Sequence, residues 1–175
     1  MATAGNATGA LQAALAAEHA AVYGYGVAGA YLSGTAMTAA TADWVAHQQA
    51  RDTLETMLRR RGAQPATAAA AYQLPSPVHD AAGAVSLAVL LENRVAAAYL
   101  GVVAVSDTAL RQFGARGVSA AAARAASWRG RTVAFPGFPA GTVAPARPAT
   151  PGPATPAADE RRAGLPVSRE RRGPG

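Results

Sequence analysis

Two glutamates stand out as residues that could do chemistry, because each lies within an apolar stretch of sequence. Glu18 is surrounded by alanines, and Glu92 directly follows a leucine-rich run. Burying a carboxylate is costly unless a cation or a metal ion neutralises it. Tyr25 follows the first glutamate by seven residues, and Tyr99 follows the second by the same number. Seven residues make two helical turns, so each tyrosine shares a helix face with its glutamate.

A positive partner for these carboxylates is expected from the segment that contains His47 and Arg51, which are one helical turn apart. We predict a buried polar core in which Arg51 neutralises Glu18 and Glu92, while the hydroxyls of Tyr25 and Tyr99 cap the carboxylates. In this interpretation the core holds no cofactor and His47 makes one ordinary hydrogen bond. His19 and His79 are predicted to lie at the surface or at the end of a helix.

A metal site is the alternative, since Glu18, His47 and Glu92 could together bind one iron or manganese ion. Arg51 argues against this alternative, because a guanidinium next to a divalent cation is electrostatically unfavourable. Stoichiometric iron or manganese that is lost on Glu18→Ala would favour it. No serine–histidine–aspartate arrangement and no glycine-rich nucleotide loop has a supporting context in the sequence.

The elements that must position these residues are predicted to be helices. Half of the residues are hydrophobic but only 6% are aromatic, so the core must consist mainly of Ala, Leu and Val. Alanine is the best helix former and a poor strand former, which favours an all-α fold. Apolar periodicity and capping residues indicate four helices, with Gly114 and Gly117 interrupting the last one; they span about residues 9–32, 38–61, 77–104 and 107–128.

The connections between these helices predict the topology. Short loops join the first helix to the second and the third to the fourth, so each pair should form an antiparallel hairpin. About 17 residues, Gly62 to Val78, separate the two hairpins. An extended segment of that length can run from one end of a bundle to the other, so we predict one long crossover. An ordinary up-and-down bundle with a loose loop is the alternative.

The C-terminal part of the chain has a different composition. Residues 131–175 contain nine of the twelve prolines and seven of the sixteen arginines. We predict that this segment is a disordered tail and that the folded domain spans residues 9–130. The formal net charge of +6 arises largely in the tail, so we expect nucleic-acid association only weakly and through the tail.

Cellular location follows from what the sequence lacks. There is no cysteine, and the first residues have no basic segment typical of a signal peptide. The long uncharged run Ala20–Ala42 is interrupted by a turn sequence at Ser33–Thr35, and the second apolar stretch contains Glu92 and Arg94. We therefore predict a cytoplasmic protein with no membrane partner. A homodimer is compatible with the thin core of a small alanine-rich bundle.

Several segments, in order along the chain, resemble a bacterial ferritin-like domain family of unknown function. They include 13–23, Trp44–Asp52, Tyr72–Pro75, 91–99 and Trp128-Arg129. The resemblance implies a ferritin-like four-helix bundle, often with a di-iron site, in which Glu18 and Glu92 match the single carboxylates of the first and third helices. A complete site also needs a Glu-x-x-His motif in each of the other helices. Trp44 precedes His47 by three residues, and the fourth helix has neither Glu nor His.

These observations predict a binding or structural module with a degenerate, metal-free polar core. The alternative is a metal-dependent oxidoreductase or metal-binding protein that uses Glu18, His47 and Glu92. A third hypothesis is tail-mediated nucleic-acid association, which predicts salt-dependent binding that truncation after Gly130 abolishes. The sequence does not identify a substrate, and it leaves open whether the chain is an enzyme.

Overall fold

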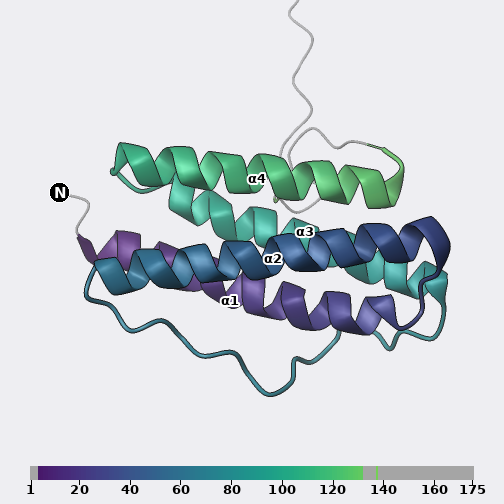
Figure 1. Ribbon diagram of the computed structural model, residues 1–175. Coiled ribbons are helices and arrows are strands. Elements are labelled where there is room, and N and C mark those ends of the chain that lie inside the picture. The colour runs from purple at the N-terminus through teal and green to yellow at the C-terminus, as the bar shows by residue number, and fades with distance from the viewer. Residues whose placement is uncertain (1–3, 132–136, 138–175) are drawn as a thin grey trace, which may run out of the picture. The chain divides into compact units, whose positions relative to one another are not determined.

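The computed structural model describes residues 4–131 and residue 137 (Figure 1). The described part is all-helical and contains four helices and no strand. The helices are α1 (Ala4–Gly29), α2 (Gly34–Arg60), α3 (Ala81–Val103) and α4 (Thr108–Arg129). This confirms the predicted all-α four-helix bundle. The predicted disordered tail lies almost entirely outside the described residues.

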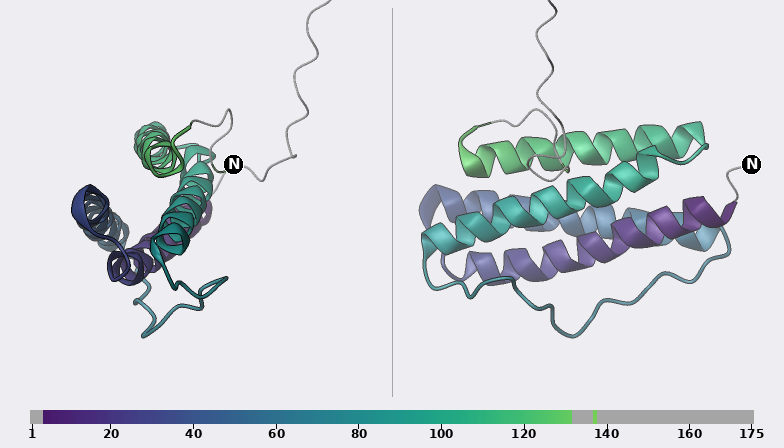
Figure 2. Two further views of the ribbon diagram at one scale, coloured as in Figure 1. Left: turned by 90° about the vertical axis from the view of Figure 1, so that its right-hand side faces the viewer. Right: turned by 180° about the vertical axis from the view of Figure 1, so that it is seen from behind.

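The helices pair as two antiparallel hairpins, α1 with α2 and α3 with α4 (Figure 1). The segment between α2 and α3 runs along the whole length of the bundle, so α2 and α3 point in the same direction (Figures 1 and 2). The predicted crossover is therefore present. α3 packs against both α1 and α4, and α2 packs mainly against α1. In the end-on view of Figure 2, α2 and α4 are the outer helices of this arrangement.

Side-chain caps determine where the helices of the second hairpin begin. Asp80 accepts a hydrogen bond from the backbone N–H of Gly83, and Asp107 accepts from those of Ala109 and Leu110. The predicted start of the third helix at about residue 77 was wrong, because Asp80 provides the cap of α3 and the preceding residues belong to the crossover. α1 ends at Gly29, three residues earlier than predicted, and α2 begins at Gly34, earlier than predicted.

The core consists of small and aliphatic side chains from all four helices. α4 can lie close to α3 because Gly114 is at the contact: a Cβ atom there would be 2.8 Å from the backbone nitrogen of Val103. Gly117 lies under the ring of Tyr99 in the same way. The prediction that these two glycines interrupt the fourth helix was wrong, because the helix is continuous and the glycines form its contact surface.

α3 has the length and apolar composition of a helix that could cross a membrane. The core helix of a soluble bundle meets the same criteria, and α3 carries the buried Glu92. Beyond the helices, Gly137 lies against the backbone of α3, where a Cβ atom would be 2.8 Å from the nitrogen of Ala97.

Candidate functional site

The central feature of the bundle interior is His47, which bridges two carboxylates from different hairpins. Its Nδ1 lies 2.6 Å from Oε2 of Glu18 on α1, and its Nε2 lies 2.9 Å from Oε1 of Glu92 on α3. All three side chains are buried, with at most 1% of their surface exposed. Both ring nitrogens can donate to carboxylates only when the imidazole is protonated. The geometry therefore describes an imidazolium held between two carboxylates.

Glu92 has two further partners. The hydroxyl of Tyr25 donates to its Oε1 at 2.7 Å, and Nε of Arg124 on α4 donates to the same oxygen at 3.0 Å. The side chain of Arg124 is 22% exposed, so its guanidinium reaches the interior from the side of the bundle. The second oxygen of Glu92, Oε2, is buried and has no hydrogen-bond partner among the described residues. Side chains from all four helices thus meet at these two carboxylates.

A third carboxylate, that of Asp43, extends the network toward the surface. Asp43 on α2 accepts a hydrogen bond from the indole N–H of Trp128 at 2.8 Å and a longer one, 3.3 Å, from Tyr25. The ring of Tyr25 stacks on the imidazole of His47 with centroids 5.2 Å apart. Trp128, from α4, lies tilted against the same tyrosine ring. These contacts fix Tyr25 between the half-buried Asp43 and the buried Glu92.

The network shifts the pKa values of its two central charges in opposite directions. Burial by itself lowers the pKa of His47, but the hydrogen bonds and negative charges of Glu18 and Glu92 outweigh burial and raise it from 6.5 to about 9. Burial by itself raises the pKa of Glu92, but the hydrogen bond and positive charge of His47, followed by those of Arg124, lower it overall. Both shifts favour the charged forms.

The surroundings of the two tyrosines and of Asp43 raise the pKa of each of these side chains. Burial, and then the negative charge of Glu92, raises the pKa of Tyr25 far above its ordinary value. Burial and then the charge of Glu18 raise the pKa of Tyr99. Each tyrosine therefore faces the glutamate of the other hairpin. Burial also raises the pKa of Asp43, although the hydrogen bond from Trp128 opposes this effect.

Arg51 does not belong to the buried network, so its predicted role as the neutralising cation was wrong. Its guanidinium pairs with the neighbouring Asp52 at 2.8 Å, and its side chain is 28% exposed. It lines a surface cavity of about 420 Å³ between α2 and the crossover, together with Glu55 and Arg59. A guanidinium reaching outward to an exposed acid avoids the desolvation that an interior position would require.

Arg124 takes the role that was predicted for Arg51. It lies within an otherwise uncharged stretch that consists mainly of Ala, Gly and Ser, 117–127. This is the same signal that identified Glu18 and Glu92, a single charge among small apolar residues. The predicted network does not include Arg124, because Arg51 lies closer to His47 in the sequence. Asp43 and Trp128, which complete the network, were also not predicted as site residues.

The prediction that His19 lies at the surface or at a helix end was wrong, because it lies within α1 and is buried, with 7% exposure. Its Nε2 lies 3.1 Å from the carbonyl oxygen of Ala66, so it attaches the crossover to α1. Gln12, two turns earlier on α1, bonds to the same segment through both its side-chain amide nitrogen and oxygen. His79 is exposed, as predicted.

The donor set of the alternative metal site does not fit an ion in this geometry. Glu18 and Glu92 bind opposite edges of the His47 ring, so one ion could not contact both carboxylates and an imidazole nitrogen. Arg124 places a positive charge 3.0 Å from Oε1 of Glu92, where it would repel a metal ion bound by this carboxylate. Within residues 4–131 and 137, no group of three His, Asp or Glu side chains is arranged to hold a metal ion.

The described structure thus defines an all-α four-helix protein whose hairpins are joined through a buried ion network. The chain belongs to the family described as "Domain of unknown function (DUF4439)", whose model matches residues 10–140. No curated protein gives a significant sequence match to the chain.

A solved structure supports the fold. The crystal structure of a conserved hypothetical protein, Rv2844, from Mycobacterium tuberculosis is similar to this chain, with a TM-score of 0.70 and 35% sequence identity. The similarity covers 73% of this chain and 97% of that protein. Both the family and the mycobacterial protein are described without an activity.

Proposed function

We propose that this chain is a metal-free member of the ferritin-like superfamily that acts as a binding or structural module. The single observation that carries the proposal is the position of Arg124, whose Nε lies 3.0 Å from Glu92 in the bundle interior. In ferritin-like di-iron proteins, metal cations neutralise the interior carboxylates. Here two side chains of the protein, His47 and Arg124, supply the positive charge.

The charges of the four side chains at the centre of the network balance without an added ion. Glu18 and Glu92 carry two negative charges, and protonated His47 and Arg124 carry two positive ones. A divalent cation added to this set would be unpaired and would face a guanidinium, which is electrostatically unfavourable. The helices and their connections support the superfamily assignment: two antiparallel hairpins, one long crossover, and single glutamates on α1 and α3.

The network also supports a structural role. It joins both hairpins, because Glu18 and His47 belong to the first hairpin and Glu92 and Arg124 belong to the second. A buried ion network rarely adds net stability compared with apolar packing, but removing one member strongly destabilises the fold. We therefore propose that the network fixes the arrangement of the two hairpins. The binding function then belongs to the outer surface of the bundle.

Metal analysis of protein purified without a histidine tag tests this proposal. We expect no stoichiometric iron or manganese in the purified chain and no change in unfolding temperature when Fe²⁺ or Mn²⁺ is added. Stoichiometric metal that Glu18→Ala removes would overturn the proposal and support the oxidoreductase alternative.

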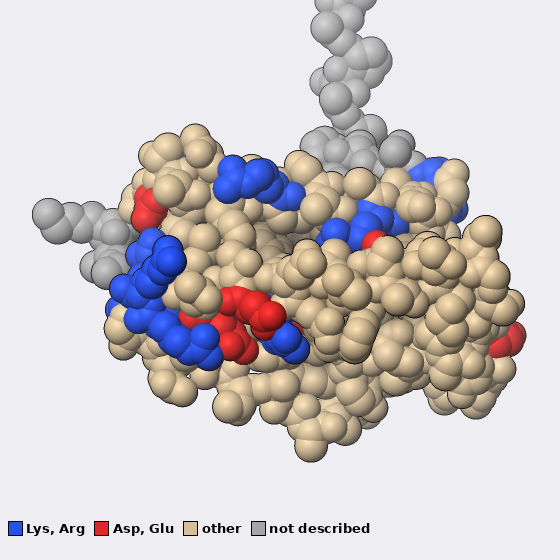
Figure 3. Space-filling view, viewed as in Figure 1, with Lys and Arg blue, Asp and Glu red and all other residues tan. Residues whose placement is uncertain are grey.

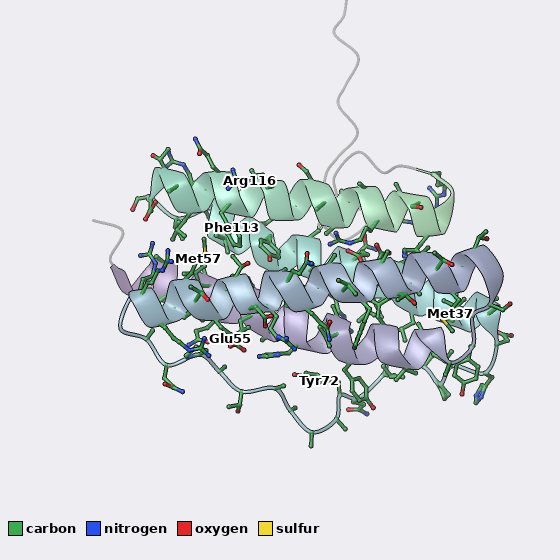
Figure 4. All side chains as sticks on the ribbon, in the orientation of Figure 1. Met37, Glu55, Met57, Tyr72, Phe113 and Arg116 are labelled. Atoms are coloured by element: carbon green, nitrogen blue, oxygen red, sulfur yellow. The ribbon has the colours of Figure 1, made fainter. Side chains whose placement is uncertain are left out.

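A gain-of-binding experiment sharpens the test. Arg124→Glu replaces the interior cation with a third carboxylate, and we expect this variant to bind Co²⁺ with a visible absorption band that the original chain does not give. Arg116→Glu is the matched control, because Arg116 is an exposed residue of the same helix and the charge change is identical (Figure 4). Equal Co²⁺ binding by the original chain and both variants would show that Arg124 does not exclude metal.

A further inference from the structure

Among the described residues, the end of the α1–α2 hairpin exposes large apolar side chains to solvent. All four large hydrophobic side chains that are exposed lie there, with 36–41% of their surface accessible; they are Tyr31, Met37, Trp44 and Val45. We refer to these four residues as the hairpin patch. Solvent-exposed apolar side chains that cluster in this way mark interaction surfaces more often than isolated ones do.

The hairpin patch borders a cavity between α1 and α2. The cavity has a volume of about 230 Å³, and its walls include Tyr25, Met37 and Trp44, with Gly26 and Gly29 on the α1 side. Among the described residues, no charged side chain lines it. Typical small-molecule pockets have volumes of about 300–1,000 Å³, so this cavity is better suited to a single inserted side chain.

The polar groups of the cavity indicate that its occupant is apolar. The hydroxyl of Thr41 donates to the carbonyl of Met37 at 2.9 Å, and the indole N–H of Trp44 donates to the carbonyl of Val22 at 3.1 Å. The hydroxyl of Tyr25 is used by Glu92 and Asp43. These groups already have partners within the chain, so an incoming side chain needs no hydrogen-bonding group to satisfy them.

Charge is absent from this end of the α1–α2 hairpin within the described residues. Asp43 is the single Asp, Glu or Arg between Glu18 and Arg51, and it is turned inward to Trp128. In Figure 3 the charged side chains of α2 gather over its C-terminal half, whereas the surface over its N-terminal half is almost entirely uncharged. Arg59–Arg61 lie about 35 Å of helix away from Met37, several Debye lengths at physiological salt.

We propose that the hairpin patch is the surface at which a second copy of this chain binds. A chain with a formal net charge of +6 repels its copies, and an uncharged face is where two copies can approach at least electrostatic cost. The patch is also self-complementary, because it carries a cavity that fits one apolar side chain and, outside the cavity walls, the exposed apolar side chains of Tyr31 and Val45. Such a surface allows a two-fold interface in which each copy inserts a side chain into the other.

The size of the patch predicts how strong this dimer is. Four side chains cover less than the roughly 800 Å² per partner that a standard-size interface buries. We therefore expect a reversible dimer whose population rises with protein concentration. This inference goes beyond the proposed function and is independent of it, because the ion network lies inside the bundle and the patch lies outside.

Sedimentation velocity of the full chain over a concentration series tests the dimer. We expect the apparent mass to rise from 17.5 kDa toward twice that value as concentration increases. Gly26→Leu should keep the protein monomeric, because nothing lies within 4 Å of a Cβ atom at this exposed position and the new side chain fills the cavity. Gly9→Leu is the matched control: it is the same change in α1, also exposed and unobstructed, but far from the patch.

Both leucine variants should fold at least as well as the original chain, because each replaces a glycine within a helix. A second variant, Met37→Glu, places a charge in the interface and should weaken the dimer at least about tenfold. Thr56→Glu, on the exposed charged half of α2, should leave it unchanged. A chain that stays monomeric at every concentration, or a dimer that Gly26→Leu and Met37→Glu leave intact, would overturn the proposal. So would monomers that bind phosphatidylcholine vesicles through the patch, which would assign it to a lipid surface.

Discussion

The two hairpins of the bundle have matching first helices and different second helices. α1 and α3 each carry a buried glutamate followed two turns later by a buried tyrosine. Their partner helices diverge, because α2 supplies the imidazole of His47 and α4 supplies the guanidinium of Arg124. The comparison shows that the acidic half of the site is repeated between the hairpins, whereas the cationic half is not.

This difference makes the two carboxylates unequal. Glu92 accepts hydrogen bonds from three side chains, which come from α1, α2 and α4. Glu18 is hydrogen-bonded to His47 and faces the hydroxyl of Tyr99. His47 is therefore the cationic partner of Glu18 within the described network, while Glu92 would keep Arg124 if the imidazole were lost. The following predictions use that inequality.

The largest effect is expected for His47→Leu. This change leaves Glu18 buried without a cation and removes one of the two cations beside Glu92, so the free energy of unfolding should fall by about 3–5 kcal/mol. Urea unfolding at pH 6, where His47 is protonated, measures the loss. The cost is expected to shrink in a Glu18→Gln background, because the stranded charge is then absent. Additive costs in this double-mutant cycle would contradict a direct pairing of the two residues.

The second prediction concerns pH. The pKa of His47 is raised in the folded state to about 9 from an ordinary 6.5, so the stability it provides is complete below pH 6.5 and is lost as pH rises through 9. The shift corresponds to about 3 kcal/mol. The lowered pKa of Glu92 acts in the opposite direction, and its contribution is lost as pH falls below its ordinary value of 4.5.

Thermal or urea unfolding from pH 5 to 9.5 should therefore show declining stability on the alkaline side. His47→Gln provides the control, since glutamine can still hydrogen-bond but does not titrate. The variant should be less stable at pH 6 and should lose most of the decline between pH 6.5 and 9. An identical pH profile for the original chain and the variant would assign the decline to other groups.

The third prediction compares two arginines. Arg124→Leu removes the second cation beside the buried Glu92, while His47 and Tyr25 remain bound to it. Because Arg124 is partly exposed, we expect a cost of about 1–3 kcal/mol, at the lower end of values for buried pairs. Arg51→Leu disrupts an ion pair with an exposed acid and should cost within about 0.5 kcal/mol. Equal costs in urea unfolding would mean that Arg124 is not part of the interior network.

These comparisons also show how far sequence alone could lead. The four helices, their pairing and the crossover were predicted correctly, because apolar periodicity, capping residues and connection lengths are local properties of the chain. The start of α3 was wrong because Ser76, Pro77 and Asp80 all provide start signals, and only Asp80 caps the helix. Choosing between them depends on where the crossover ends, which is not a local property.

The sequence pattern marks Arg124 as an isolated charge in the fourth helix, but its pairing with Glu92 could not be predicted in the same way. Arg51 is the predicted cation because it is close to His47 in sequence. Side chains one helical turn apart do not point in the same direction, however, and Asp52 provides Arg51 with a solvent-exposed partner. Arg124 is 32 residues from Glu92 and reaches it only through the packing of α4 on α3. That packing depends on Gly114 and Gly117, which were interpreted as weak points of the helix instead of contact points. The sequence pattern is enough to place the two glutamates in the core, but which cation pairs with them depends on how the helices pack in three dimensions.

A smaller effect than for the interior charges is expected from the two tryptophans, one in each hairpin. Trp128→Phe on α4 removes the N–H that binds Asp43 at 2.8 Å but keeps an aromatic ring against Tyr25, so it should cost about 1 kcal/mol. Trp44→Phe on α2 removes a bond to the carbonyl of Val22 at the surface, where water can replace the indole, and should cost less. Because the Trp128 bond lowers the pKa of Asp43, its loss should raise that pKa further, which an NMR titration of the carboxylate would detect. A raised pKa of Asp43 in the Trp128 variant and an unchanged one in the Trp44 variant would show that the network extends to the end of α4. Two unchanged pKa values would confine the network to its four central side chains, which are Glu18, His47, Glu92 and Arg124.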